Sequence, residues 1–273
     1  MSEQNLSDAG SYKFGQFKKN DKQLEYLKLQ ATIVLDTEQE AWRQSGLKPG
    51  MKVLDLACGP GFTACELAKF IGPDGEVIGI DISEELIAVA HQAKATEGVE
   101  NVSFAVGNAY ELNLSDSSFD FVCARFLFQH LERPLDVLLN ILHVLKPGGT
   151  LCIVDIDDNW VSFAPESNAV RKVIRQARAG QKRKGGNRMI GTQLYGLLTA
   201  TGFRDVRTTV FPVTTQDLGV KLFLGLTIVS RLEFVSKVRK LLMLPLLKRI
   251  RKAGAAPDAW GAAGIFVATG VKG

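Results

Sequence analysis

The fold of this chain is decided by the stretch Val53-Leu54-Asp55-Leu56-Ala57-Cys58-Gly59-Pro60-Gly61-Phe62. An apolar run, a turn of small residues and a helical pattern follow one another here, which predicts a strand that leads through a tight loop into a helix. Glycines in such a loop let the backbone approach a ligand, because a Cβ would block either the ligand or the positive φ of the turn. The sequence therefore predicts a ligand-binding loop at the carboxyl end of this strand.

An acidic residue ends the next apolar run along the chain. The run Glu76-Val77-Ile78-Gly79-Ile80 brings Asp81 to the carboxyl end of the neighbouring strand, where a carboxylate commonly binds both hydroxyls of a ribose. The loop letters A-C-G-P-G-F-T-A lack the third glycine of the nicotinamide fingerprint G-x-G-x-x-G. The two segments predict a pocket for an adenosine-bearing cofactor and disfavour a nicotinamide dinucleotide.

These segments and three later ones resemble, in the same order, the motifs of the class I S-adenosylmethionine-dependent methyltransferases. The first loop is similar to motif I, D-x-G-x-G-x-G, with Ala57 where the family usually has its first glycine. Three later stretches resemble the adenine-binding turn G-D-A, the fourth strand and the turn before the fifth strand: Gly107-Asn108-Ala109, Phe119-Asp120-Phe121-Val122 and Lys146-Pro147-Gly148-Gly149. The match covers residues 50–156, and it resembles the branch of quinone, sterol and natural-product methyltransferases.

The resemblance implies an α/β fold with a doubly wound, mostly parallel seven-stranded sheet, whose last strand is antiparallel and lies between the fifth and the sixth. It divides the chain into an N-terminal helical lid at residues 1–50, a Rossmann-like core that binds S-adenosylmethionine at 51–156, and the rest of the sheet with a helical cap at 157–273. The cap is expected in an insertion at 214–261, because about fifty residues replace a hairpin there and structureless loops of that length are uncommon.

Local patterns predict further elements. A helix is expected over residues 21–45, and the aromatic residues expected to fold over the cofactor are Tyr12, Phe14 and Tyr26. Pro134 suits the first position of a helix, and the i, i+3, i+4, i+7 period predicts its buried face: Leu135, Leu138, Leu139 and Leu142. The fifth strand is expected to end at Asp155, before a linker and a basic helix within 157–190.

The cofactor residues follow from the resemblance, position by position. The positions that match family residues near S-adenosylmethionine are Gln30, Asp55, Ala57, Cys58, Gly59, Gly61, Asp81, Ile82, Asn108, Ala109 and Arg125. Asp55 is expected to organise the loop, Asp81 to hold the ribose and Ile82 to pack on the adenine. Asn108 replaces the usual aspartate, and its amide oxygen can still accept from the adenine amino group. The carbonyl of Arg125 is expected to receive the amino group on the sulfonium side.

The catalytic candidate is His130, which follows the fourth strand where many family members carry a histidine. Its ordinary pKa of about 6.5 suits proton acceptance near neutrality, and a base is needed only when the acceptor must lose a proton. The alternative is a histidine that hydrogen-bonds to the backbone at the start of the next helix. Asp157 and Asp158, just past the fifth strand, are candidates to bind a polar group of the acceptor or to hydrate a loop.

Two groups of basic residues stand out. The first basic group contains no acid and comprises Arg171, Lys172, Arg175, Arg178, Lys182, Arg183, Lys184 and Arg188. The second basic group interleaves with leucines and comprises Lys237, Arg239, Lys240, Lys248, Arg249, Arg251 and Lys252. Each can be a solvated helix face beside a core-facing stripe. The insertion at 214–261 can also rest on an anionic membrane or an acidic partner, or join two copies of the chain. Nucleic acid is the least favoured partner, because the net charge is only +4.

Composition is that of an ordinary globular protein, with 46% hydrophobic and 23% charged residues. The four cysteines form no C-x-x-C pair and have no histidine at metal-ligand spacing, which argues against disulfides and any metal site. Residues 1–20 lack the apolar segment of a secretory signal, and no run has the length needed to span a bilayer. A cytoplasmic location is expected.

The resemblance favours an enzyme that moves the methyl group of S-adenosylmethionine to a small, apolar or aromatic metabolite by in-line displacement. Phe126 and Phe128 offer an apolar wall for such an acceptor, or pack the core. The stretch Ala124-Arg125-Phe126-Leu127 lacks the proline turn with which nucleobase-amine methyltransferases grip their substrate. The alternatives are an RNA or protein methyltransferase that uses the basic residues 171–188, and a cyclase that binds S-adenosylmethionine on the same scaffold.

Overall fold

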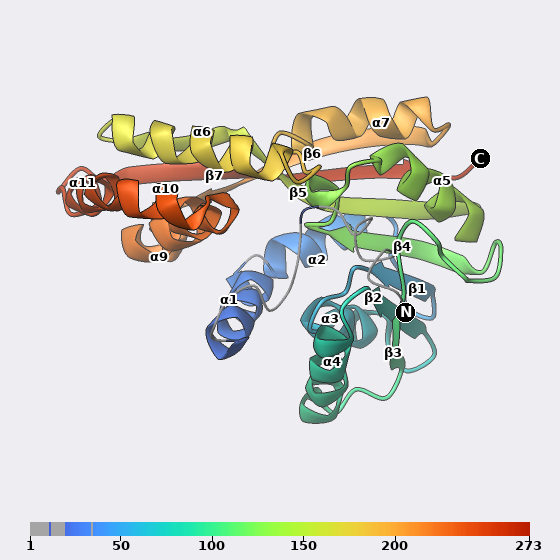
Figure 1. Cartoon of the computed structure of the whole chain (residues 1–273). Coiled ribbons are helices and arrows are strands. Elements are labelled where there is room, and N and C mark those ends of the chain that lie inside the picture. Colours follow the sequence, from blue (N-terminus) through green and yellow to red (C-terminus); the bar gives the residue numbers. More distant parts are fainter. Residues whose placement is uncertain (1–10, 12–19, 34) are drawn as a thin grey trace.

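A computed structural model describes residue 11, residues 20–33 and residues 35–273 of the chain. Its centre is a seven-stranded sheet in the order β3-β2-β1-β4-β5-β7-β6, in which β7 runs antiparallel between β5 and β6 (Figure 1). The strands are β1 (Lys52–Leu56), β2 (Glu76–Asp81), β3 (Val102–Val106), β4 (Phe119–Arg125), β5 (Leu145–Ala164), β6 (Arg204–Thr214) and β7 (Trp260–Val271). The expected fold class and the place of the last strand are confirmed.

Helices accompany the sheet and also form the cap. Those outside the cap are α1 (Asn20–Ile33), α2 (Leu35–Gln44), α3 (Phe62–Ile71), α4 (Glu84–Glu97), α5 (Pro134–Val144), α6 (Asn168–Lys182) and α7 (Leu194–Ala200). Those in the cap are α8 (Thr215–Leu218), α9 (Val220–Leu224), α10 (Lys237–Leu242) and α11 (Leu244–Gly254). The single helix expected over 21–45 is therefore two helices, and the insertion at 214–261 is helical as expected.

The sheet separates two apolar cores, because successive side chains of a strand point to opposite faces. Val53 of β1 belongs to the core that α2, α3 and α4 cover, and Leu54 belongs to the core that α5 and α7 cover. Both side chains are fully buried. β1 is thus a central strand covered on both faces, and its carboxyl end is held in a fixed position between two packed layers.

A third apolar core lies where β5, β7 and β6 extend beyond the other strands, beside α6 and the cap helices (Figure 1). β5 continues to Ala164, which pairs with Trp260 of β7. The prediction of a linker after Asp155 is therefore wrong, and Asp157 and Asp158 lie inside the strand rather than past it. The strand is longer because β7 supplies it with an antiparallel partner over this extension.

The buried face of α5 differs from the leucine stripe that the period predicts. Leu135 and Leu139 are 43% and 55% exposed, whereas Leu138 is fully buried. The residues of α5 that enter the core are Val137, Leu138, Ile141 and Val144. Apolar residues surround most of this helix, so the sequence fits more than one face, and packing against β5 and α7 selects the face that is buried.

Candidate functional site

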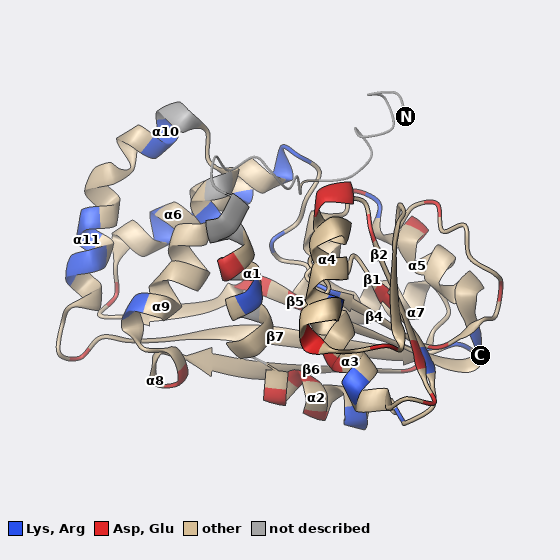
Figure 2. Cartoon of the chain, turned by 90° about the horizontal axis from the view of Figure 1, so that it is seen from below, with Lys and Arg blue, Asp and Glu red and all other residues tan. Residues whose placement is uncertain are grey.

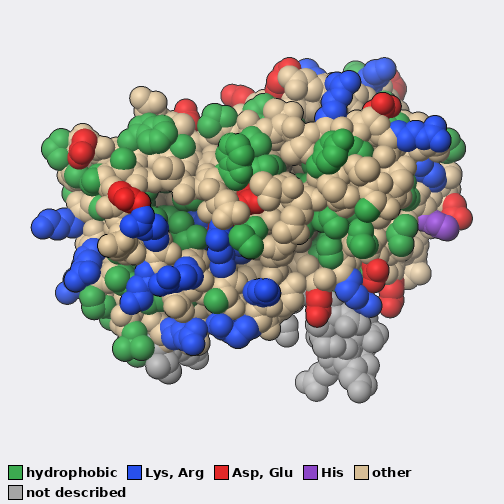
Figure 3. Space-filling view, turned by 90° about the horizontal axis from the view of Figure 1, so that it is seen from above, with side chains coloured by type: hydrophobic (Ala, Val, Ile, Leu, Met, Phe, Trp, Pro, Cys, Tyr) green, Lys and Arg blue, Asp and Glu red, His purple; other side chains and the backbone are tan. Residues whose placement is uncertain are grey.

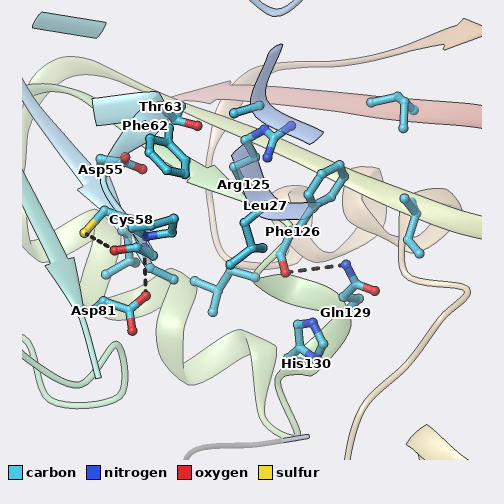
Figure 4. Close-up of a pocket in the computed structure, with 18 of the residues that line it drawn as sticks. Leu27, Asp55, Cys58, Phe62, Thr63, Asp81, Arg125, Phe126, Gln129 and His130 are labelled. Carbon is cyan, nitrogen blue, oxygen red and sulfur yellow. Dashed lines mark hydrogen bonds between the residues drawn. The ribbon is translucent and has the colours of Figure 1, made fainter. Parts of the chain in front are cut away.

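A cavity of about 310 Å³ opens beyond the carboxyl ends of β1, β2 and β4, where ligands bind in open α/β sheets. The loop after β1 and Asp81 at the end of β2 form one side, and Phe126, Gln129 and His130 after β4 form the other (Figure 4). Helix α1 and the cap complete the wall with residues that include Leu27, Ala31, Leu218 and Leu226. The volume lies at the lower end of the range typical of small-molecule sites.

The loop after β1 has the backbone that its small residues predict. Ala57 and Gly59 both line the cavity and both adopt a positive φ, of 62° and 54°. Ala57 therefore occupies the left-handed region despite its Cβ, at a cost of about 1–2 kcal/mol. Gly61 does not line the cavity. A Cβ there would lie 2.7 Å from Ala90 and from the ring of Phe104, so this glycine allows close packing around the start of α3.

Asp81 is held in place by the backbone of the cofactor loop. Its Oδ2 accepts from the N–H of Gly59 at 2.9 Å, and its Oδ1 accepts from the N–H of Ser83 at 2.9 Å. Burial raises the pKa of Asp81, although these backbone hydrogen bonds oppose the rise. The carboxylate therefore has a fixed orientation at the end of β2 and lies in the cavity wall.

Asp55 of β1 supplies an acceptor that the rest of the described chain leaves unused. The side chain is 1% exposed, and its Oδ2 has no hydrogen-bond partner among the described residues. Burial raises the pKa of Asp55 to about 7, against the lowering effect of Arg125. A buried carboxylate oxygen without a donor costs free energy. An amino group such as that of the methionine part of S-adenosylmethionine would satisfy this oxygen, so the residues present fit the cofactor.

The turn after β3 forms the next part of the wall. Asn108, Ala109 and Ile82 all line the cavity, as the sequence predicts. The Oδ1 of Asn108 accepts from the N–H of Tyr110 at 3.0 Å, which fixes the turn and leaves a second lone pair for a ligand donor. Cys58 also lines the cavity, and its burial raises the pKa of the thiol well above the ordinary value.

Glu38 of α2 is a buried acid that the sequence patterns did not indicate. It is 2% exposed and accepts from Arg125 Nε at 2.5 Å. Burial raises the pKa of Glu38, and the charge of Arg125 opposes this rise. The Arg125 guanidinium also lies 4.4 Å from the ring centroid of Phe126, and both residues line the cavity. A glutamate within the polar sequence of α2 carries no signal of burial, which explains why it was missed.

His130 lies in the cavity wall within a network of polar side chains. Its Nδ1 is 2.8 Å from Ser11 Oγ and 3.3 Å from Gln181 Nε2. Burial, together with the charges of Arg188 and Lys184, lowers the pKa of His130 to about 3. The imidazole is therefore neutral at physiological pH, and it is a weaker proton acceptor than a histidine with an ordinary pKa.

Asp158 is the centre of a buried ionic cluster. Its carboxylate accepts from Arg188 Nε at 3.0 and 3.1 Å and from Arg231 Nη2 at 2.7 Å, and Arg178 Nε lies 3.7 Å away. Burial by itself raises the pKa of Asp158, but the charges of Arg231 and Arg188 outweigh it and hold the pKa below its ordinary value. Two members of the first basic group, Arg178 and Arg188, are therefore partners of an internal acid.

The structure describes four of the residues predicted for the lid and the cofactor site only in part or not at all. Tyr12 and Phe14 fall outside the described residues. Gln30 and Tyr26 lie on α1, but their side chains are not described. Within residues 20–33 and 35–273, no cluster of histidine, cysteine and acidic side chains is suited to hold a metal ion. In the same part of the chain, no helix has the length and apolar character to cross a membrane.

Curated relatives match the central part of the chain. A model of the methyltransferase domain matches residues 47–202. The chain is 33% identical over 138 residues to a demethylmenaquinone methyltransferase of Bacillus cytotoxicus, which covers 48% of the chain and 58% of that protein. It is 35% identical over 179 residues to an uncharacterized 37.1 kDa protein in transposon TN4556 of Streptomyces fradiae, which covers 62% and 47%. The chain spans about half the length of the curated relatives that it matches.

Solved structures share the fold. A SAM-dependent methyltransferase from Aquifex aeolicus aligns with a TM-score of 0.53 and 25% identity, covering 70% of this chain and 91% of its own. The [4+2]-cyclase SpnF aligns with a TM-score of 0.59 and 21% identity, covering 87% and 81%. An open sheet whose first loop and second-strand acid share one cavity defines a class of proteins that bind adenosine cofactors. The chain belongs to the S-adenosylmethionine-dependent methyltransferase family.

Proposed function

We propose that this chain transfers the methyl group of S-adenosylmethionine to a small, apolar or aromatic metabolite. The observation that carries the proposal is a single cavity that runs from Asp81 at the cofactor loop to a mostly apolar wall. The apolar side chains of that wall include Leu27, Phe126, Ile156, Leu218, Leu226 and Ile265. A cavity enclosed by helix α1 and the cap suits a small acceptor better than a polymer.

Bound S-adenosylmethionine supplies an activated methyl group, which forms a bond to the acceptor as its bond to sulfur breaks. The chain's own residues align the two reactants and exclude water, and such alignment can contribute about 7–11 kcal/mol. In this proposal Asp81 holds the ribose, Asp55 holds the methionine amino group and Asn108 meets the adenine edge. The N-terminal segment 1–50 acts as a lid, because α1 already contributes to the cavity wall.

His130 contacts the acceptor in this proposal as a neutral hydrogen-bonding group. With a pKa of about 3, its imidazole has little tendency to accept a proton at neutral pH. Turnover of His130→Gln should therefore exceed that of His130→Ala, and neither variant should change the pH dependence of turnover. Loss of a rate limb near the ordinary histidine pKa in both variants would instead support proton transfer by His130.

The activity test uses purified protein, S-adenosylmethionine with a labelled methyl group, and a panel of phenols, naphthols and hydroquinones. We expect release of S-adenosylhomocysteine that depends on the acceptor, and a product heavier by one labelled methyl group. A product of unchanged mass would support the cyclase alternative. Label found only on added RNA or protein would support the macromolecular alternative, which is weakened because Arg178 and Arg188 of the first basic group are tied to Asp158.

We also propose that the cap rests on an anionic membrane surface. The leucines at the junction of α10 and α11 are strongly exposed: Leu241 at 68%, Leu242 at 74% and Leu244 at 52%. The sequence from Val235 to Pro257 contains the second basic group and no acid, and Figure 2 shows Lys and Arg positions in blue along the ribbon of α11. Figure 3 shows basic and hydrophobic side chains together at this end of the molecule. Apolar side chains among cations are typical of interfacial binding.

Vesicle flotation tests the membrane contact. The protein should float with vesicles that contain phosphatidylglycerol and not with phosphatidylcholine vesicles, and the double variant Leu241→Ser/Leu242→Ser should lose this binding. Leu139→Ser is the matched control, because Leu139 is an exposed leucine of α5 outside the cap. A dimer in gel filtration that the double variant dissociates would contradict the membrane proposal and assign the leucines to a second copy.

The four free, buried cysteines support the expected cytoplasmic location.

A further inference from the structure

Ser11 is bound to His130 through both its backbone and its side chain. The N–H of Ser11 donates to the carbonyl of His130 at 2.9 Å, and its Oγ lies 2.8 Å from His130 Nδ1. Ser11 is only 4% exposed, although nothing in the polar sequence around it indicates burial. At 2.8 Å a hydroxyl and a ring nitrogen share a hydrogen, so one of the two atoms donates and the other accepts.

The space that holds the Ser11 hydroxyl is narrow. A Cβ on Gly186 would lie 2.5 Å from Ser11 Oγ, 2.6 Å from Gln181 Cγ and 2.8 Å from the carbonyl oxygen of Gln129. The hydroxyl therefore depends on glycine at this position. Ser11 and Gln181 are both buried and lie outside the cavity wall, to which His130 belongs. The two side chains thus approach Nδ1 of an imidazole that forms part of the wall.

The amide of Gln181 has a defined orientation. Its Oε1 accepts from Arg188 Nη1 at 3.0 Å, and its Nε2 donates to the carbonyl of Gln129 at 2.9 Å. A flipped amide would turn its N–H groups toward a guanidinium donor and its oxygen toward a carbonyl, and both hydrogen bonds would be lost. The atom of Gln181 that faces Ser11 and His130 is therefore its nitrogen.

This nitrogen decides which ring atom of His130 carries the proton. Gln181 Nε2 lies 3.1 Å from Ser11 Oγ and 3.3 Å from His130 Nδ1. An amide nitrogen donates and does not accept, so a proton on Nδ1 would face a second donor. When Nδ1 has a lone pair there instead, Gln181 donates to Ser11 and the Ser11 hydroxyl donates to His130. The pKa of about 3 keeps the imidazole neutral, and a neutral imidazole has one N–H, which is then at Nε2.

We infer that Ser11 is a positioning residue that holds His130 in the tautomer with its proton on Nε2. His130 then meets the methyl acceptor as a hydrogen-bond donor and removes no proton from it. This consequence rests on the proposed function and narrows its substrate class. The acceptor group beside His130 offers a lone pair, as a carbonyl or phenol oxygen does, and a group that only donates, such as an ammonium, is disfavoured.

Long-range ¹H–¹⁵N correlation spectra test the tautomer, because protonated and unprotonated ring nitrogens have well-separated ¹⁵N shifts. The protein is labelled in its histidines, saturated with S-adenosylhomocysteine and studied near neutral pH. The signals of His130 are those that disappear in His130→Gln. We expect the shift of an unprotonated nitrogen at Nδ1 and of a protonated nitrogen at Nε2, and a protonated Nδ1 would overturn the inference.

Variants test the role of Ser11. In Ser11→Ala the tautomer ratio of His130 should shift toward the Nδ1–H form by about three- to tenfold, the effect of losing one hydrogen bond. Ser118→Ala, which removes a hydroxyl outside the cavity wall, should leave the ratio unchanged. Gly186→Ala should cause a similar shift, because its Cβ displaces the Ser11 hydroxyl. Its matched control is Gly196→Ala, since a Cβ there meets no atom within 4 Å. An unchanged ratio in Ser11→Ala would remove Ser11 from this role.

Calorimetry with S-adenosylhomocysteine separates the inference from the proposed function. Affinity in Ser11→Ala should stay within about threefold of wild type, while methylation of phenols and hydroquinones becomes slower. Failure of the wild-type protein to bind S-adenosylhomocysteine would contradict the proposed function, and the tautomer is then determined from the same spectra without ligand. An Nδ1–H signal in protein that binds S-adenosylhomocysteine would overturn only the inference about Ser11 and His130.

Discussion

At the scale of single residues, the proposed cofactor site depends most on Asp81. The N–H groups of Gly59 and Ser83 already fix its carboxylate, so the charge needs no rearrangement to meet two ribose hydroxyls. Hydrogen bonds to a charged group contribute about 1.5–3 kcal/mol each. Asp81→Ala should therefore weaken S-adenosylhomocysteine binding by about a hundredfold or more, as measured by calorimetry. The exposed Asp74→Ala serves as control, and unchanged affinity in Asp81→Ala would remove Asp81 from the site.

The ionised form of Asp55 lowers the stability of the folded protein. Its pKa is about 7 in the folded protein and about 3.9 in an unfolded chain. Between these values the unfolded chain loses the proton and the folded protein keeps it, so this carboxyl makes stability fall as the pH rises toward 7. Without cofactor, Asp55→Asn should raise the free energy of unfolding at about pH 8 by on the order of 2 kcal/mol, and little at about pH 4. Urea titration measures both, and equal gains at both pH values would exclude this carboxyl as the cause.

The two ends of the cavity differ in how far the sequence predicts them. Ala57, Asp81 and Asn108 could be predicted, because each follows directly from a strand end and the carboxyl ends of parallel strands meet at one edge. Arg188 and Arg231 could not, because they come from segments far apart in sequence and reach one carboxylate only after the cap has folded. In the sequence, each is indistinguishable from a surface cation.

At the scale of elements, α5 offers a matched pair of leucines. Leu138 is fully buried and Leu139 is 55% exposed, although the two are adjacent and both fit the predicted stripe. Leu138→Ala should lower the free energy of unfolding by about 2–5 kcal/mol, the cost of a cavity in a packed core. Leu139→Ala should lower it by less than about 0.5 kcal/mol. Equal costs in denaturant titrations would contradict the observed orientation of the helix.

The elements whose limits were predicted wrongly from the sequence are those whose limits depend on partners distant in the chain. β1 and β2 lie where the apolar runs predict them, because short buried strands are bounded by local turn residues. The extension of β5 to Ala164 has no local signal, because it exists only where β7 pairs with it. The helical character of the cap was predictable from its length. Its packing on α6 was not predictable, because that requires the third core.

At the scale of the whole molecule, three apolar cores predict two regions of different stability. The cores on the two faces of the sheet share the central strands, whereas the third joins the cap, α6 and the extension of β5 and β7. Phe223 is fully buried in the third core, so a substitution there tests whether the third core opens without the other two. Phe223→Ala should speed amide exchange in residues 168–182 and 220–254 and leave β1 to β3 unchanged, because local opening follows contiguous packed units.

The matched variant is Val53→Ala, in a core shared by the central strands. It should speed exchange in β1, β2 and β4 and weaken S-adenosylhomocysteine binding, because β1 positions the cofactor loop. In Phe223→Ala, by contrast, affinity for S-adenosylhomocysteine should stay within about threefold of wild type, because local opening of the cap leaves the carboxyl ends of β1 and β2 in place. Uniformly faster exchange throughout the chain in both variants would show that cap and sheet unfold as one unit, and that cofactor and acceptor regions cannot open independently.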